Sequence, residues 1–318
     1  MIFLTNSSHI DAQMFRFFRH IILGIITICC GLCLMNCTNE PKDGKIHIVA
    51  TTGIIGDILS SSLDSHVVID VLMKPGVDPH LYKATAGDVT LLLNADIIIH
   101  NGLHLEGKMG EVLHKLSEKK VVIAMSEQLP KHRLRYIDGA YDPHLWFDVE
   151  LWSLALEGIL KQIQQNYPKV IQDNADRINQ YVEKLHQLDH HVDSMISLIP
   201  KERRILITAH DAFGYFGNAY DIQVIGLQGM STLSDFGMND LMRIGDLIID
   251  KKVRSIFVEK SIAPRSMEAL LHNVQTRGGT VRIGGNLFAD ALDTPGTKAG
   301  TYIGMFEQNV TTIQKALQ

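Results

Sequence analysis

Two copies of one short motif carry the residues with the clearest capacity for chemistry. The tetrapeptide Asp-Pro-His-Leu occurs at 78–81 and again at 142–145, with its histidine in third place each time. Its proline restricts the backbone, and residues held in rigid loops are often those that bind ligands. A single loop histidine is more often an ordinary solvated side chain, so neither His80 nor His144 predicts a site by itself.

His210 and Asp290 supply the evidence that the repeated motif lacks. Each follows a short apolar run that predicts a strand, at 203–209 and at 280–285. Ligands of α/β proteins bind in the crevice beyond the carboxyl ends of strands. With the two motif histidines, these residues provide three imidazoles and one carboxylate, a donor set suited to a divalent first-row metal ion.

The elements that must position these residues follow an alternating pattern. Alternation of apolar β-branched runs with amphipathic stretches favours an α/β protein with βαβ units and a mostly parallel sheet. Strands are expected at 46–52, 66–73, 95–101, 119–125, 203–209, 222–227, 254–260 and 280–285, and helices at 84–95, 103–116, 147–167, 233–251, 264–276 and 300–317.

Residues 168–199 interrupt this alternation. They contain no glycine and no proline after the first position, and their apolar residues keep helical spacing. One helix of this length would span roughly 45 Å, enough to run past two lobes. The alternative is two helices that meet near Asp189. The predicted organisation is an N-terminal lobe at 46–167, a linking helix at 168–199 and a C-terminal lobe at 200–318.

The N-terminus predicts export. Residues 15–36 place two arginines before an apolar run, and Cys37 follows at the position of a lipidated cysteine, so residues 1–37 read as a lipoprotein signal peptide. An ordinary cleaved signal and a single membrane anchor are the alternatives. The polar residues 38–45 predict a tether. All four cysteines lie within 29–37, so a metal site in the remaining chain must use histidines and carboxylates.

Four segments resemble the metal-binding motifs of the TroA-like (cluster A-I) family of zinc and manganese ABC transporter solute-binding lipoproteins. They read GVDPHLYK, DPHLWFD, AHDAFGYF and LFADALD, and the resemblance extends over roughly residues 46–318, with NGLHLEG and GLQGMST also fitting. The metal ligands that it implies are His80, His144, His210 and Asp290. It also implies two Rossmann-like (β/α) lobes joined by a single long rigid α-helix, with the metal site at the lobe interface.

The function implied by this resemblance is capture and delivery without catalysis. The protein would bind the metal outside the cytoplasm and pass it to the membrane permease of an ABC importer, which an ATPase drives. We expect a monomer, held as a membrane-anchored lipoprotein that faces the periplasm or the cell exterior. Asp142, Asp211 and Glu259 are candidates to orient the imidazoles by accepting ring N–H groups. The net charge of −5 gives no basic surface for nucleic acid.

The identity of the metal is less strongly specified. The chain lacks the long His/Asp/Glu-rich insertion of many zinc-dedicated members, and it has His210 where manganese-dedicated members often place glutamate. Imidazole ligands at low coordination favour Zn²⁺, whereas a bidentate Asp290 would make Mn²⁺ acceptable. Two other functions are weighed. A metallohydrolase would need an open coordination position and a general base, for which Glu259 is an unplaced candidate. A surface adhesin would need a protein-binding patch, which no sequence feature defines.

Overall fold

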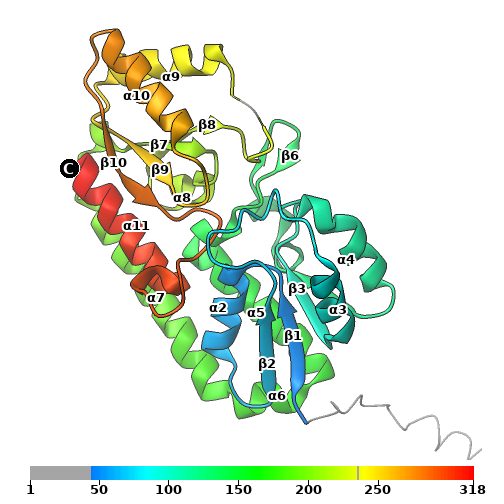
Figure 1. Cartoon of the computed structure of the whole chain (residues 1–318). Coiled ribbons are helices and arrows are strands. Elements are labelled where there is room, and N and C mark those ends of the chain that lie inside the picture. The colour runs from blue at the N-terminus through cyan, green and yellow to red at the C-terminus, as the bar shows by residue number, and fades with distance from the viewer. Residues whose placement is uncertain (1–43, 235) are drawn as a thin grey trace, which may run out of the picture. The chain divides into compact units, whose positions relative to one another are not determined.

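A parallel sheet forms the core of the N-terminal half of the chain. Its strands are β1 (Ile46–Ala50), β2 (Val67–Val71), β3 (Ile97–His100) and β4 (Val121–Ala124). They are ordered β2-β1-β3-β4 and are rich in valine and isoleucine, as expected of a parallel sheet that helices cover. The helices of this half are α2 (Gly53–Ser62), α3 (Ala86–Asn94), α4 (Gly110–Ser117) and α5 (Val149–Asn166) (Figure 1).

The computed structural model describes residues 44–234 and 236–318. The predicted signal peptide at 1–37, including Cys37, and all but the end of the predicted tether at 38–45 lie outside the described residues. Within the described part of the chain, no helix combines the length and the apolar character needed to cross a membrane.

The C-terminal half contains two parallel strand pairs. β7 (Ile205–His210) pairs with β8 (Gln223–Gln228), and β9 (Ser255–Glu259) pairs with β10 (Arg282–Leu287). β7 also lies against β9. The helices of this half are α8 (Gly214–Ala219), α9 (Met238–Lys251), α10 (Arg265–Thr276) and α11 (Tyr302–Leu317).

Two predicted helices begin later than the sequence pattern suggested. The helix expected at 233–251 begins at Met238, because the Asp240 carboxylate accepts the Gly237 N–H at 3.0 Å and caps the helix there. The helix expected at 103–116 gives way to a turn before α4. Leu103 and His104 have φ angles of 51° and 63°, and such left-handed backbone cannot continue a right-handed helix.

The predicted linking helix at 168–199 is divided at Asn174. α6 (Pro168–Asp173) precedes this residue and α7 (Ala175–Ser197) follows it, and α7 continues without a break past Asp189. The division therefore lies near the start of the predicted helix rather than at the alternative position considered above.

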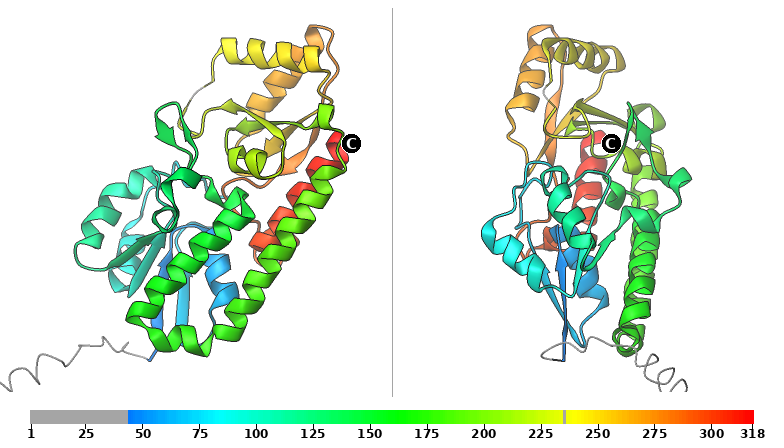
Figure 2. Two further views of the ribbon diagram at one scale, coloured as in Figure 1. Left: turned by 180° about the vertical axis from the view of Figure 1, so that it is seen from behind. Right: turned by 90° about the vertical axis from the view of Figure 1, so that its right-hand side faces the viewer.

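A long-range contact explains this division. The buried side chain of Asn174 accepts hydrogen bonds from the backbone N–H groups of Asp64 and Ser65, at 2.9 and 3.2 Å, and donates to the carbonyl of Val170. These bonds tie the chain to the turn before β2 and hold Asn174 outside helical geometry. α7 alone spans about 34 Å and runs beside both halves, with α11 packed along it (Figure 2).

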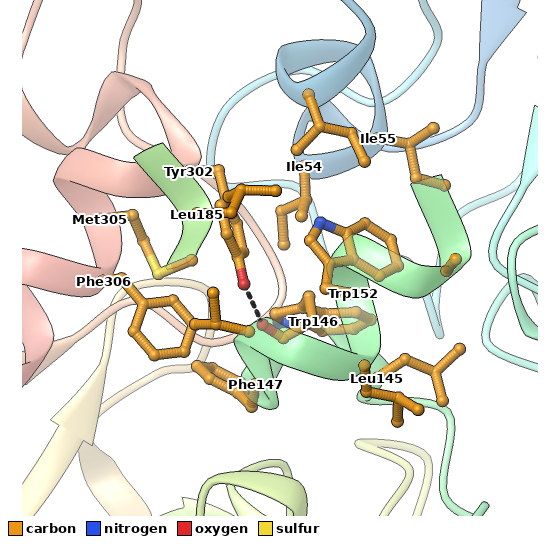
Figure 3. Packing of buried hydrophobic residues seen from close by; sticks show 14 of the residues in the cluster. Ile54, Ile55, Leu145, Trp146, Phe147, Trp152, Leu185, Tyr302, Met305 and Phe306 are labelled. Atoms are coloured by element: carbon orange, nitrogen blue, oxygen red, sulfur yellow. Dashed lines mark hydrogen bonds between the residues drawn. The ribbon is translucent and has the colours of Figure 1, made fainter. Parts of the chain in front are cut away.

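One apolar cluster runs through both halves of the molecule. Figure 3 shows Phe147, which lies just before α5, near Phe306 of α11, and Tyr302 of α11 beside Leu185 of α7. The Tyr302 hydroxyl donates a hydrogen bond of 2.7 Å to the backbone carbonyl of Trp146. The two halves are therefore joined by a packed aromatic interface as well as by a helix. This interface holds the halves together next to the predicted site residues.

Candidate metal centre

The four predicted ligands lie together at the boundary between the two halves. Nε2 of His80 and of His210 lie 3.8 and 3.3 Å from Oδ2 of Asp290, and Nε2 of His144 lies 3.6 Å from Oδ1 of the same carboxylate. One ligand atom from each residue lies within 4.8 Å of all the others. Neighbouring ligands of a tetrahedral Zn²⁺ ion are about 3.3 Å apart, so the four side chains are close to ligand spacing.

Each half contributes two of these predicted ligands, from strand ends and from the loops that follow strands or precede helices. His80 lies in the loop after β2, and His144 lies just before α5. His210 is the last residue of β7, and Asp290 follows β10. All four are buried, with 0–3% of each residue exposed. Among the described residues, no other group of three or more His, Cys, Asp or Glu side chains lies close enough to hold a metal ion.

The repeated Asp-Pro-His segments fold into the same local turn. Asp78 Oδ1 accepts the backbone N–H of His80 at 2.9 Å, and Asp142 Oδ1 accepts that of His144 at 3.0 Å. An aspartate that accepts the N–H two residues ahead forms an Asx turn, which the intervening proline stiffens. In both copies the turn fixes the backbone of the histidine.

Carboxylates orient two of the three imidazoles. Nδ1 of His144 donates to Asp142 Oδ1 at 2.7 Å, and Nδ1 of His210 donates to Glu259 Oε2 at 2.6 Å. A carboxylate acceptor requires the proton on Nδ1, so each ring presents Nε2 to the centre, with a free lone pair whenever the ring is neutral. Asp142 and Glu259 therefore occupy the orienting positions that the sequence suggested. Among the hydrogen bonds of the described residues, none joins Asp211 to an imidazole.

The atoms that face the centre have no hydrogen-bond partner. They are Nε2 of His80, His144 and His210 and both carboxylate oxygens of Asp290, and all five are buried. An unpartnered buried polar atom costs about 1–3 kcal/mol, so five at one point are a large destabilisation in a protein of marginal stability. A divalent cation would coordinate all of them, which makes the donor set fit a metal ion.

Burial and neighbouring charges shift the pKa values of three of the four predicted ligands in different directions. Burial lowers the pKa of His80 to about 4, against a smaller opposing effect of Asp290. Burial also acts to lower the pKa of His210, but Glu259 and Asp290 outweigh it and raise that pKa well above its ordinary value. Burial acts to raise the pKa of Asp290, but the imidazoles, led by His210, hold it well below its usual range. Without metal, the His80 ring is therefore neutral at pH 7, whereas the neighbouring carboxylates favour the doubly protonated, positively charged form of the His210 ring.

Three residues that support the site escaped the sequence analysis. Nη1 of Arg135 lies 3.3 Å from Asp142 Oδ2, and the Asn101 side chain donates to the Pro143 carbonyl at 2.8 Å. The Thr232 hydroxyl donates to Asp78 Oδ2 at 2.7 Å. Asn101 and Thr232 belong to the fitting segments NGLHLEG and GLQGMST, but nothing in those segments indicates which turn each residue contacts.

Comparison with known proteins gives consistent similarities. The profile of a family described as zinc-uptake complex component A, periplasmic, matches residues 48–316. Zinc-binding protein TroA of Treponema pallidum is 46% identical over 280 residues, covering 88% of this chain and 91% of that protein. Manganese-binding lipoprotein MntA of Bacillus subtilis is 42% identical over 288 residues, covering 90% of this chain and 94% of that protein. The solved structure of TroA from T. pallidum matches with a TM-score of 0.84 at 45% identity, covering 86% of this chain and 99% of that one.

Proposed function

This chain belongs to the family of zinc-uptake complex component A, and on that basis we propose that it captures one divalent first-row metal ion and delivers it to an ABC importer. The observation that carries this proposal is the set of five buried, unpartnered donor atoms that converge from both halves. The fold agrees with this function, since small-ligand sites occur preferentially where two domains meet and these donor atoms come from both halves.

Zn²⁺ is the preferred cargo in this proposal, and Mn²⁺ is the second. Three imidazoles and one carboxylate oxygen make a four-coordinate set that suits Zn²⁺. Both oxygens of Asp290 face imidazole nitrogens, Oδ1 toward His144 and Oδ2 toward His80 and His210. A bidentate carboxylate would raise the coordination number to five, which favours Mn²⁺ more than a monodentate one. The names of the two relatives, one zinc-binding and one manganese-binding, support this pair of metals.

The names of relatives also support the partners and the location in this proposal. MntA is named a lipoprotein, and a further relative, SloC of Streptococcus mutans, is named a metal ABC transporter substrate-binding lipoprotein. We infer that residues 1–37 are a signal peptide, that Cys37 is lipidated and that 38–45 tether the body to the outer side of a membrane. A monomeric body of two lobes, 46–167 and 200–318, would then present the metal to the permease, whose ATPase drives import.

We infer no catalytic role for the bound metal. A catalytic zinc site keeps one position open for water, whereas four protein ligands here would fill a tetrahedral set. Glu259, the candidate general base for a hydrolase, is engaged on His210 through both its carboxylate oxygens. No observation on the described surface favours an adhesin.

The test is metal-dependent stability of the purified full-length chain. The protein is expected to bind one Zn²⁺ or Mn²⁺, and a free metal concentration of a hundred times Kd would add about 2.7 kcal/mol to the free energy of unfolding. His210→Ala should remove most of this gain. His186→Ala, a change at an exposed position of α7, is the matched control and should keep it. An equal gain in His210→Ala and in the unchanged chain would contradict the proposed site.

A further inference from the structure

Thr232 makes a hydrogen bond that joins the two halves directly at the metal centre. This half-buried residue lies between β8 and α9 in the C-terminal half, whereas its acceptor, Asp78, lies in the first Asp-Pro-His turn of the N-terminal half. The distance from Thr232 Oγ1 to Asp78 Oδ2 is 2.7 Å. A hydroxyl that donates to an ionised carboxylate forms one of the stronger hydrogen bonds in proteins.

This bond acts on a metal ligand through one carboxylate. Asp78 Oδ2 accepts from Thr232, and Asp78 Oδ1 accepts from the backbone N–H of His80. The position of the His80 backbone therefore depends on a residue of the opposite half. The equivalent carboxylate of the second turn, Asp142, is held by Arg135 of its own half.

Free volume lies next to the segment that leads into the first turn. A cavity of about 330 Å³ is bordered by Met73, Lys74, Pro75 and Val77, and on another side by Asp290. A segment that borders a cavity can move into it without compressing a close-packed core, whose side chains resist displacement. Asp78 is thus held by a hydrogen bond to the other half, while the residues just before it, up to Val77, border free volume.

We propose that Thr232 is a positioning residue for His80 and that its hydrogen bond to Asp78 sets the rate at which bound metal leaves. When the two halves separate, the bond breaks, and the first turn moves toward the cavity and withdraws His80 from the ion. His144, His210 and Asp290 then hold the metal with one ligand fewer. This inference rests on the proposed function, because it concerns release of the metal from the same four ligands.

The test compares rates of metal dissociation from the purified full-length chain. Zn²⁺-loaded protein is mixed with excess chelator, and release is followed by stopped flow. Thr232→Val is expected to raise the dissociation rate about tenfold, the effect of losing one hydrogen bond to a charged group, and to change the association rate less than about twofold. Thr232→Ser, which keeps the hydroxyl, should restore the slow rate, and this rescue separates positioning from general damage.

Two controls isolate the contact. Thr90→Val removes an exposed threonine hydroxyl that donates to the Ala86 carbonyl within α3, and it should leave the rate unchanged. Asp78→Ala removes the acceptor, so adding Thr232→Val to it should have no further effect. Slow dissociation from Thr232→Val, or equal acceleration in Thr232→Val and Thr232→Ser, would overturn the inference while leaving the proposed function intact. Failure of the unchanged chain to bind Zn²⁺ or Mn²⁺ would instead overturn the proposed function.

Discussion

The two Asp-Pro-His-Leu turns have one sequence but different surroundings. His144 is fully buried, its ring is held by Asp142, and its neighbour Leu145 is part of the apolar core. In the first turn, Leu81 is 44% exposed. No carboxylate within 44–234 or 236–318 accepts a hydrogen bond from the His80 ring. The first turn therefore borders solvent, and the residues just before it border a cavity, while the second turn belongs to the packed interface between the halves.

This difference shows that a local motif fixes a local conformation and little more. Both aspartates close the same turn on the backbone N–H of their histidine. What differs is how each aspartate carboxylate is held. Arg135 of the same half pairs with the Asp142 carboxylate, and Asn101 and Tyr215, one from each half, donate to carbonyls of the second turn. The Asp78 carboxylate instead accepts a hydrogen bond from Thr232 of the other half. The His144 ring therefore has an orienting carboxylate that its own half holds in place, whereas the turn of His80 relies on a hydrogen bond from the other half.

Removal of each motif histidine gives the largest expected effect. His80→Ala and His144→Ala should each weaken metal binding by more than about a hundredfold, beyond the effect of losing a residue that only orients a ligand. The metal-free proteins should differ. His144→Ala leaves the buried Asp142 without its ring donor and should lower the free energy of unfolding by about 1–3 kcal/mol. Titration with metal and chemical denaturation of both variants check this, and equal destabilisation of the two would break the comparison.

The leucines of the two turns give the next largest effect. Leu145→Ala empties a fully buried position and should cost about 2–5 kcal/mol of unfolding free energy. Leu81→Ala changes a largely exposed side chain and should cost less than about 0.5 kcal/mol. Urea unfolding of the metal-free variants measures both values. If Leu81→Ala costs as much as Leu145→Ala, the first turn is packed as firmly as the second.

The aspartates test how each imidazole is oriented. Asp142→Asn removes the charge that orients the His144 ring and pairs with Arg135, so metal affinity should fall about 10–100-fold. Asp78→Asn should lower it less, because Asp78 contacts only the backbone of its histidine. Competitive metal titration of the two variants provides the measurement. An equal loss would mean that the ring of His80 has an orienting partner too.

The pH dependence of metal affinity is the last and smallest expected effect, and it extends the comparison to His210. The pKa of His80, lowered to about 4 by burial, leaves this ring neutral at pH 7, so it releases no proton when metal binds. The raised pKa of His210 means that its ring must lose one. Affinity should then fall about tenfold per pH unit as the pH decreases from 7. Calorimetry in buffers of different ionisation enthalpy counts the released protons, and a count of zero at pH 7 would contradict this assignment.

The same shifts set the pH dependence of the metal-free fold. The pKa of His210 is higher in the folded chain than in the unfolded chain, so protonation of its ring stabilises the fold. This contribution is complete below the unfolded pKa near 6.5 and is lost as the pH rises through the raised pKa of the folded chain. The lowered pKa of His80 acts in the opposite sense. The unfolded chain takes up this proton first, so stability falls as the pH decreases from about 6.5 toward 4.

Much of the fold and the candidate site could be predicted because the relevant signals are local. Apolar alternation located the strands, and residues at their carboxyl ends had to lie near one another, as His210 and Asp290 do. The turn at Leu103 and the division at Asn174 could not be predicted in this way. Asn174 is an ordinary helical residue by spacing, and it ends α6 only because the distant Asp64–Ser65 turn lies within reach of its side chain.

The residues that support the ligands were missed for a related reason. Arg135 and Thr232 are single polar residues in loops, and nothing beside them in the sequence indicates a partner. Glu259 was among the suggested acceptors, and the structure places it at the end of a strand next to the one that ends at His210. Thr232 acquires its role from the approach of two halves, which is a property of the folded molecule alone.

The aromatic interface also gives the molecule an optical property. The chain has two tryptophans, and both are buried in the joint between the halves. The ring of Trp146 lies 5.3 Å from that of His144, and its Nε1 donates to the carbonyl of Ala289, the residue before Asp290. Indole emission responds to nearby charge, and Zn²⁺ has a filled d shell whereas Mn²⁺ does not. Intrinsic fluorescence should therefore register both the arrival of the cargo and its identity in unlabelled protein.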